Sequence, residues 1–423
     1  MTIGSFVTSS LGMQAQSHAL QQISANVANV STTGYKKVNA RFETLMTVYN
    51  DNGSSSNYFS ANNVDSRMVD LEGQATITDS LYDLSLTGRG FFVMQGTYQT
   101  LYTRAGEFQA TAETPPGQAP QTITYNVPAD GGGTRTQTKA VSYFKNADGY
   151  YVMGWNYDAG REAFSSSLEP IAITPADYYS GHETTKLALK GNVPADATEP
   201  QKLKFGIYDS EFNMHGLTTT WTKTSSGNTW TIDLALDNGG AVTSGPIEVR
   251  FDEMARLVSP TGTVPVSVDW GNGQSGTIDL DLRNMTQFAK GLNASVLDQD
   301  GKSTGVLTKM SWTSDGVLTA SYSNGASTPV CKVAIAHVQV PNSMEAVSGT
   351  MFAHTPEAGS LEIVDLQTTR TETTVQGGRL ESSNVSLEEE FSELVICQRA
   401  YSGSVNAFTT ANEMTQETIA ILT

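Results

Sequence analysis

Cysteine, positive charge and long apolar runs are all scarce in this chain of 423 residues. Two cysteines cannot form a framework of disulfides, and they do not make a Cys-x-x-Cys motif. Lysine and arginine number 25 against 43 acidic residues, which gives a net charge of −18. This balance argues against nonspecific nucleic-acid binding and against anionic membrane surfaces, both of which need basic residues. No apolar run approaches the ~18 residues of a transmembrane helix.

The beginning of the sequence also lacks the basic segment and the continuous apolar segment of a cleavable signal peptide. We therefore expect no cleaved signal, which leaves open export by a route that needs none. Charged residues make up 16% of the chain, against roughly 25% in typical domains. Ser, Thr, Asn and Gly take their place, a composition typical of β-sheet surfaces and turns. The length predicts two to four domains.

Residues 1–34 contain no Asp, Glu, Lys or Arg. An exposed helix of this length would carry several charges, so we expect the segment to be buried against other protein. An ordinary amphipathic core helix is the alternative, but the missing charges favour packing between molecules. The apolar residues follow a seven-residue spacing typical of a coiled coil, and the stripe ends near Gly34. Its members are Phe6, Met13, Leu20 and Val27, with Ile23 on the flank.

A second helical stripe is predicted at the other end of the chain. Ser386 and Glu389 have the spacing of a capping box, and a helix of roughly 36 residues follows, about 55 Å long. Its apolar residues occupy the a and d positions of about five heptads, interrupted by polar residues in the same register. A helix this long cannot bury its stripe on itself. The apolar members are Leu387, Phe391, Leu394, Tyr401, Val405, Phe408, Ile419 and Leu422.

The simplest partner for the C-terminal stripe is the N-terminal stripe, so we expect the two ends of the chain to form a coiled coil. Such a pair still leaves apolar and amide surface uncovered. That surplus predicts lateral association with copies of the same chain, with the two stripes as the polymer interface. The alternative is an intramolecular helical hairpin that forms no polymer.

The middle of the chain has a different sequence pattern. From residue 71 onward, short strand-like runs alternate with Gly, Asp and Asn turns, which predicts antiparallel β domains. Residues 50–66 are interpreted as a polar linker, and the Pro/Gly/Thr-rich residues 111–139 as a long hairpin or loop. Residues 182–290 are expected to form a separate β unit that ends in a short helical segment, MTQFAK.

Sequence patterns that suggest chemistry are weak throughout. Gly88-Arg89-Gly90 precedes a strand rather than a helix, so it is interpreted as a turn and not as a dinucleotide loop. The five histidines show no metal-ligand spacing. Cys331 and Cys397 are expected to be buried, inert thiols. We therefore predict no catalytic residue, no cofactor and no metal site, and expect a protein that is not an enzyme.

Four ordered motifs resemble those of the flagellar rod and hook protein family. They are ANVANVSTTGYK at residues 25–36, DLSLTGRGFFV at 83–93, YTRAGEF at 102–108, and LESSNVSL with QRAY at the C-terminal end. The residues that carry the resemblance are Asn26, Asn29, Thr33, Gly34, Tyr35, Lys36, Gly88, Gly90, Phe91, Phe92, Asn384, Gln398 and Arg399. The family pattern is interrupted at residues 111–147, which separate Phe108 from the next strand more widely than usual.

The resemblance implies a structural subunit of a bacterial flagellum. The extra β unit at 182–290 fits the hook members, because rod members are shorter and lack it. A hook member would be an extracellular tubular homopolymer, a bendable universal joint that transmits torque from rod to filament. Its expected partners are the distal rod, hook cap and hook–filament junction proteins and the flagellar type III export apparatus. A distal rod protein and, less favoured, a β-rich carbohydrate-binding protein are the alternatives.

These observations predict a mixed fold, with a terminal α-helical coiled coil and two or more antiparallel β-rich domains. The chain is expected to run outward and return, so that the domains are nested. The predicted divisions are residues 1–34 with 380–423 for the helical domain, 35–70 with 366–379 for a connector, 71–181 with 291–365 for an inner β domain, and 182–290 for an outer β domain.

Overall fold

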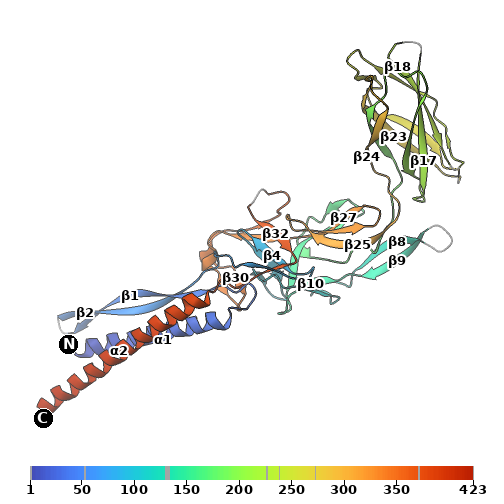
Figure 1. Ribbon diagram of the computed structural model, residues 1–423. Coiled ribbons are helices and arrows are strands. Elements are labelled where there is room, and N and C mark those ends of the chain that lie inside the picture. Colours follow the sequence, from blue (N-terminus) through green and yellow to red (C-terminus); the bar gives the residue numbers. More distant parts are fainter. Residues whose placement is uncertain are drawn as a thin grey trace.

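In a computed structural model the chain forms an elongated molecule with three tiers (Figure 1). Two terminal helices and a long β-hairpin lie at one end, a large β domain lies in the middle, and a separate β unit lies at the far end. The chain passes outward through these tiers and returns, so both termini lie at the same end. The structure describes residues 2–51, 54–128, 134–224, 227–237, 239–271, 273–369 and 372–422.

The terminal helices pack against each other in antiparallel orientation. They are α1 (Thr2–Ala28) and α2 (Leu387–Leu422). Phe6 meets Phe408 toward the tip, with ring centroids 4.3 Å apart, whereas the base of the pair is formed near the start of α2. The prediction that the two chain ends pair is confirmed. None of the described helices is both long and apolar enough to span a membrane.

A long β-hairpin lies along α1, formed by β1 (Val38–Asp51) and β2 (Ser54–Arg67) in continuous antiparallel register. The side-chain amide of Asn63 on β2 donates a hydrogen bond of 2.6 Å to the carbonyl of Ala15 on α1. The interpretation of residues 50–66 as a polar linker is therefore wrong. Because Ser and Asn have low strand propensity, β2 depends on pairing with β1 rather than on its own composition.

The middle tier is built on a 15-stranded sheet in which strands from before the outer unit pair with strands from after it. Phe92, Met94, Val152 and Ile335 lie fully buried in its core. The domain therefore needs both halves of the chain, as the nested prediction requires. The main path of the sheet is β14 (Tyr178–Tyr179), β25 (Gly305–Trp312), β26 (Val317–Tyr322), β27 (Ser327–Val333), β11 (Tyr151–Asp158), β5 (Phe91–Gln95), β6 (Thr100–Thr103), β30 (Met351–Ala353) and β29 (Glu345–Ala346).

Shorter elements complete this β domain. The strands that branch from the main path are β7 (Gln109–Thr111), β10 (Tyr143–Lys145), β12 (Ala163–Phe164), β13 (Glu169–Pro170), β28 (Ile335–Val338) and β31 (Leu361–Val364), with 3-10 turns η1 (Pro341–Ser343) and η2 (Pro356–Ala358). Three strand pairs stand apart from the main sheet: β3 (Ala75–Ile77) with β33 (Arg379–Glu381), β4 (Leu84–Thr87) with β32 (Thr374–Gly377), and β8 (Thr122–Pro128) with β9 (Thr134–Ala140). The last pair is the hairpin expected within residues 111–139.

The outer unit is a sandwich of two five-stranded sheets. Its core is filled by Trp221, Trp230 and Trp270, all almost completely buried. One sheet contains β19 (Ala241–Val242), β22 (Val264–Asp269), β23 (Ser275–Thr286), β15 (Lys186–Asn192) and β24 (Asn293–Gln299). The other contains β16 (Gln201–Tyr208), β17 (Met214–Lys223), β18 (Thr229–Leu236), β20 (Ile247–Phe251) and β21 (Leu257–Ser259).

The end of the outer unit differs from the expectation in two ways. The prediction of a helical segment at MTQFAK is wrong. Strand β23 continues through Met285 and Thr286, and no helix follows in residues 287–290. The next strand, β24, pairs with β15 of the same sheet. The outer unit therefore extends beyond residue 290, since a strand from the returning chain is needed to complete its sheet.

Candidate functional site

A buried ionic cluster joins the helical end of the molecule to the middle β domain. The ammonium of Lys36 lies 2.6 Å from the carboxylate of Glu381, and both side chains are almost fully buried. Arg104 approaches the second oxygen of Glu381 at 3.4 Å. Burial lowers the pKa of Lys36, although the charge and hydrogen bond of Glu381 oppose that shift. A buried charge pair of this kind is strongly destabilising to break, so it holds the N-terminal and C-terminal motifs in one arrangement.

A second ion pair joins the same region to the first turn of α2. Lys37 lies 2.7 Å from the carboxylate of Glu390, which is completely buried. Burial alone would lower the pKa of Lys37, but the hydrogen bond and the charge of Glu390 outweigh it and raise the pKa. The side-chain amide of Asn26 also donates to Glu390 at 3.0 Å. The base of α1, the start of β1 and the start of α2 are therefore tied together by polar contacts.

Asn26 determines how the chain turns from α1 into β1. Its amide donates to the carbonyl of Val38 at 2.9 Å, and its oxygen accepts from the amide of Val38 at 3.0 Å and from the hydroxyl of Tyr35 at 3.2 Å. Gly34 lies in the left-handed region with φ of 69°, and a Cβ there would come within 2.5 Å of the backbone of Ala105. No other residue fits at Gly34 without moving that backbone.

The C-terminal motif closes the same junction. The side chain of Asn384 accepts from the amide of Lys37 at 2.7 Å and donates to the carbonyls of Met68 and Leu71 at 2.9 and 3.1 Å. Glu381 contributes its backbone as well, because its carbonyl accepts from the amide of Gly34 at 2.8 Å. Residues far apart in the sequence thus meet in one place, which we call the junction and define as Asn26, Gly34, Tyr35, Lys36, Lys37, Arg104, Glu381, Asn384 and Glu390.

The remaining motif residues serve the turn before β5 and the two helices. Arg104 donates to the carbonyl of Gly88 at 2.6 Å, which connects this turn to the junction. Gly90 has φ of 134°, and a Cβ there would lie 2.5 Å from Ile335. Phe91 and Phe92 are buried in the β core. Asn29 donates to the carbonyl of Ala25 and accepts from Thr32 near the end of α1, and the neighbouring Thr33 is half-buried, whereas Gln398 and Arg399 lie exposed on α2.

The surface of α1 is covered from two sides. Ala15, Ala19, Ile23 and Asn26 are buried on this helix, which contacts both α2 and the β1–β2 hairpin. The predicted stripe of Phe6, Met13, Leu20 and Val27 is half-buried. The absence of charged residues in 1–34 is therefore partly explained by packing within one molecule. The β1–β2 hairpin covers a face of α1 that was expected to be covered by other molecules.

The stripe predicted on α2 divides into two groups in the structure. Leu394, Val405 and Phe408 are half-buried, whereas the side chain of Leu422 lies outside the described set. The predicted Phe408 meets α1, and small residues lie beside it, with Ser404 against Gly12 and Ala411 buried. The helices approach closely here, since a Cβ on Gly12 would lie 3.3 Å from the hydroxyl of Ser404. Large apolar residues alone therefore did not indicate the contact face.

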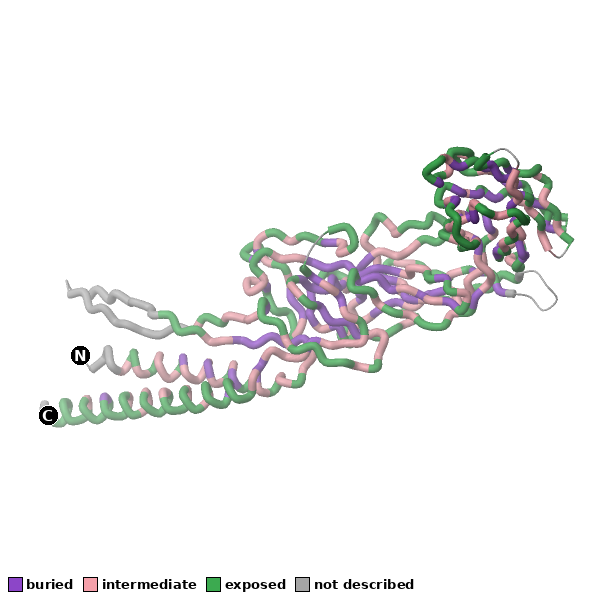
Figure 2. The backbone as a smooth tube through the Cα atoms, turned by 45° about the horizontal axis from the view of Figure 1, so that its top comes forward, coloured by how far each residue is buried: buried purple, intermediate pink, exposed green. Residues whose placement is uncertain are grey.

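The other apolar residues of α2 stay exposed, and Figure 2 shows how much of this helix is exposed. Phe391 is 54% exposed and Val395 is 45% exposed. Exposed positions of a helix such as α2 would normally carry polar residues. We call these exposed residues the flank stripe and define it as Leu387, Phe391, Tyr401 and Ile419 of the predicted stripe together with Val395, which was not predicted.

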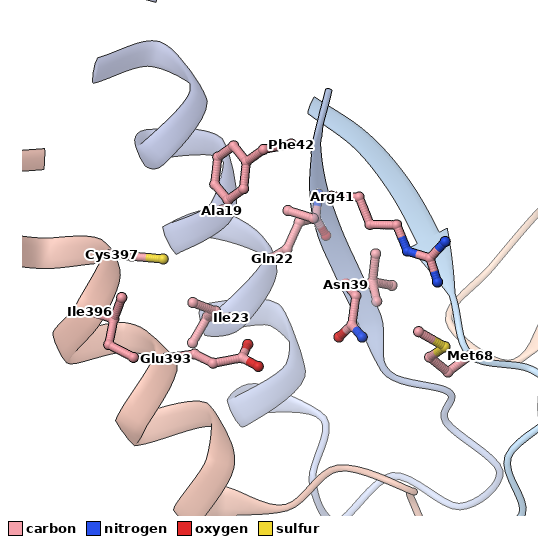
Figure 3. A pocket seen from close by; sticks show the side chains of 12 residues that line it. Ala19, Gln22, Ile23, Asn39, Arg41, Phe42, Met68, Glu393, Ile396 and Cys397 are labelled. Carbon is pink, nitrogen blue, oxygen red and sulfur yellow. The ribbon is translucent and has the colours of Figure 1, made fainter. Parts of the chain in front are cut away.

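A groove of about 390 Å³ opens between α1, α2 and β1 (Figure 3). Ile396 is 65% exposed beside it, and Phe42 on β1 faces it. The thiol of Cys397 points into the groove and is only half-buried, which differs from the expected burial. Burial and the nearby charge of Glu393 raise the pKa of Cys397, so the thiol is protonated at neutral pH. Cys331 is fully buried, as expected.

The described residues contain no group of three or more His, Cys, Asp or Glu side chains able to hold a metal ion. His18 lies 3.6 Å from Asp65 on β2, and His215 lies 2.9 Å from Asp209 in the outer unit. Each is a single pair with a structural partner. The arrangement offers packing surfaces and rigid joints rather than a centre for bond-making chemistry.

Comparisons with known proteins agree with this architecture. Three family models match in chain order: the flagella basal body rod protein model over residues 7–36, the flagellar basal body protein FlaE D2 domain model over 179–302, and the flagellar basal body rod FlgEFG protein C-terminal model over 376–421. The chain belongs to the flagellar rod and hook protein family. The matched models and relatives are structural, non-enzymatic proteins of the flagellar rod and hook.

Relatives match the chain over nearly its whole length. The flagellar hook protein FlgE of Rhizobium meliloti (strain 1021) is 26% identical, with 97% of each chain covered. That of Borreliella burgdorferi is 23% identical, again with 97% of each chain covered. The crystal structure of the Helicobacter pylori flagellar hook protein FlgE2 shares the fold, with a TM-score of 0.52 and 13% identity over 73% of this chain and 100% of that chain.

The comparisons and the structure together show what the sequence analysis missed. The motif residues Asn26, Gly34, Tyr35, Lys36 and Asn384 meet at the junction, but their charged partners Arg104, Glu381 and Glu390 were not predicted as a set. One signal was available, because Lys36 and Lys37 are the first charges after a charge-free segment. Two adjacent lysines at such a boundary need acidic partners when they are buried.

Proposed function

We propose that this protein is the structural subunit of the flagellar hook, a tubular homopolymer that bends as a universal joint and transmits torque from rod to filament. The proposal is supported by hook proteins that match nearly the full length of the chain. A distal rod protein of the same family is the second candidate. The model match at 179–302, which spans the outer unit, favours the hook because rod members of the family are expected to lack this unit.

The observation that carries the proposal is the flank stripe on α2. Phe391 and Val395 are four residues apart and therefore lie on the same side of the helix, both largely exposed. Exposed apolar strips of this kind are buried by association. In the assembled hook, the flank stripe packs against helices of neighbouring subunits, and the terminal helices form the inner wall of the tube.

The β domains form the outer layers of the tube in this proposal. Their surfaces are polar and weakly charged, so neighbouring subunits make many modest contacts. Such contacts are exchanged at low cost when the tube bends, whereas the helices keep the tube continuous along its axis. The domain divisions expected from the sequence, with the outer unit extended to β24, serve this division of labour.

The location and partners follow from the same proposal. The subunit is exported unfolded by the flagellar type III apparatus and is added outside the cell beneath a hook cap. At its two ends the polymer contacts the distal rod and the hook–filament junction proteins. Gln398 and Arg399, exposed on α2 beside the flank stripe, take part in subunit contacts.

The proposal is tested by placing a charge on the flank stripe. Phe391→Asp puts a carboxylate into a contact that the polymer buries, so we expect the monomer to fold and the tubes to be lost. Thr410→Asp adds the same charge at an exposed position outside the flank stripe and is the matched control. Electron microscopy of assembled material and of hooks on cells gives the result. Tubes of normal yield from Phe391→Asp would contradict the proposed interface, and straight rather than curved tubes from the unaltered chain would favour a rod protein.

A further inference from the structure

The β8–β9 hairpin touches the point where the chain leaves the middle β domain for the outer unit. The hydroxyl of Tyr125 on β8 donates to one carboxylate oxygen of Asp177 at 2.8 Å. The ammonium of Lys139 on β9 donates to the other oxygen at 2.6 Å. Asp177 immediately precedes β14, the last strand before the outer unit. Both strands of the hairpin therefore bind the same residue, at the edge of the middle sheet just before the connector.

Two strands of chain connect the outer unit to the middle β domain, one leaving and one returning. His182 and Lys302 exchange backbone hydrogen bonds of 2.9 Å between them. Closer to the middle domain, the carbonyl of Asp177 accepts from the amide of Leu307 on β25 at 2.9 Å. Asp177 thus binds the returning strand through its backbone and the hairpin through its side chain. A motion of the connector at this residue must move the hairpin as well.

The hairpin needs this contact for its own stability. In the part of the chain that the structure describes, β8 and β9 pair only with each other. A two-stranded hairpin alone is marginally stable in water. Tyr125 and Val127 on β8 are nevertheless buried, to 8% and 3% exposure, and β8 contacts β14, the edge strand of the middle sheet that leads into the connector. Asp177 and β14 lie against β8 and supply contacts that an isolated hairpin lacks.

We propose that the β8–β9 hairpin is a brace that fixes the direction in which the outer unit leaves the middle β domain, with Asp177 as the positioning residue. A connector of two strands can bend about its own axis, and a third support from the side restricts that bending. The inference goes beyond the proposed function, because it concerns the orientation of the two β bodies within one molecule and holds whether or not the chain forms a hook.

The chemistry of the contact agrees with a steady support. The hydrogen bond from Lys139 lowers the pKa of Asp177, burial opposes that effect, and the hydroxyl of Tyr125 adds to it. The carboxylate is therefore ionised at neutral pH and accepts from both donors. The side chains of Lys139 and Asp177 are 40% and 42% exposed, so the ion pair alone contributes little. The hydrogen bond from the nearly buried Tyr125 is the stronger part of the support.

Spin labels on the two β bodies measure the brace directly in the full-length monomer. We choose Glu248→Cys on β20 and Glu362→Cys on β31, both exposed positions, in a Cys397→Ser background. Cys331 is fully buried and does not take the label. Double electron–electron resonance then gives the distribution of distances between the outer unit and the middle β domain.

The brace is removed by combining Asp177→Asn with Tyr125→Phe, and we expect a broader distance distribution with unchanged circular dichroism. Asp237→Asn is the matched control, because it weakens the partly exposed pair with Lys204, 2.8 Å apart within the outer unit, and leaves the connector intact. We expect the control to keep the narrow distribution. An unchanged distribution in the double variant would overturn the proposal, and so would equal broadening in the control. Loss of hydrogen-exchange protection in β8 and β9 of the double variant would add support, and full retention would count against the brace.

Discussion

The outer β unit and the terminal helical pair bury their apolar residues in opposite ways. In the outer unit, Trp221 and Trp230 are completely buried between two sheets. On α2, Phe391 is 54% exposed, whereas small residues such as Ala411 are buried against α1. An element that encloses its largest side chains is stable by itself, and one that leaves them outside gains stability by association. The difference indicates which end of the molecule folds alone and which end the proposed polymer completes.

The junction differs from both the outer β unit and the terminal helical pair, because the side chains that it buries are charged. Its charged residues are as buried as a core, with Lys36, Glu381 and Glu390 at most 2% exposed. Buried ion pairs favour one arrangement more than they add stability. The junction therefore sets the position of the helical pair on the β domain, which a regular polymer would require of every subunit.

Removal of α1 should produce the largest effect and separates the two regions most clearly. Without Thr2–Ala28, α2 loses the partner that covers its inner face, so we expect assembly to be abolished while both β bodies stay folded. Electron microscopy reports on assembly, and near-ultraviolet circular dichroism reports on the tryptophan core of the outer unit. Tubes formed by the truncated chain would show that α1 is not needed for assembly.

Trp230→Ala tests the other side of the comparison. The side chain is completely buried, so its truncation should destabilise the outer unit by about 3–5 kcal/mol. Met254→Ala, at a position 70% exposed, should change little and is the control. Urea unfolding followed by tryptophan fluorescence measures both. If Trp230→Ala also removed the helical circular dichroism at low urea, the outer unit would not be an independent body.

Glu381→Leu tests the junction. The substitution leaves Lys36 buried without its carboxylate and should cost about 3–5 kcal/mol. Adding Lys36→Met removes the buried ammonium that has lost its partner, so the double variant should recover part of the lost stability. Urea unfolding followed by helical circular dichroism gives the free energy of unfolding of the parent, the two single variants and the double variant, which together form a double-mutant cycle. Strictly additive effects would mean that Lys36 and Glu381 do not interact in the folded protein.

The pH dependence of the outer unit should show the smallest effect. Burial alone would raise the pKa of Asp209, but hydrogen bonds from His215 and from Asn213 and Glu211 outweigh it and lower the pKa. Because the folded pKa lies below the unfolded one, this contribution is complete above the unfolded pKa and is lost as the pH falls through the folded value. Asp209→Asn should remove that acid sensitivity. Equal acid destabilisation of variant and parent, measured by thermal unfolding, would assign it to other groups.

The sequence predicted the pairing of the chain ends and the nested β domains, because these follow from long periodic patterns and ordered motifs. It did not predict the β1–β2 hairpin, since β2 is rich in Ser and Asn and becomes a strand only through its partner. The Asn-Gly pair at residues 52–53 is a hairpin signal that the polar composition concealed.

The face of α2 that contacts α1 was also predicted only in part from the sequence. Heptad positions identified Phe408 correctly as a residue that meets α1, but Tyr401 is exposed in the structure. The small Ser404 lies against α1 instead, at the point where Gly12 allows the helices to approach closely. Apolar periodicity gives the direction of a stripe, whereas the side chains of the facing helix decide which residues of it are buried.

Hydroxyl-radical footprinting of the monomer and of the assembled polymer tests the central claim most directly. Phe391 and Tyr401 are exposed in the monomer, so both should be readily oxidised there. The account predicts that their oxidation falls sharply on assembly, since neighbouring helices cover the flank stripe. Equal oxidation of both residues in the monomer and in the polymer would contradict it.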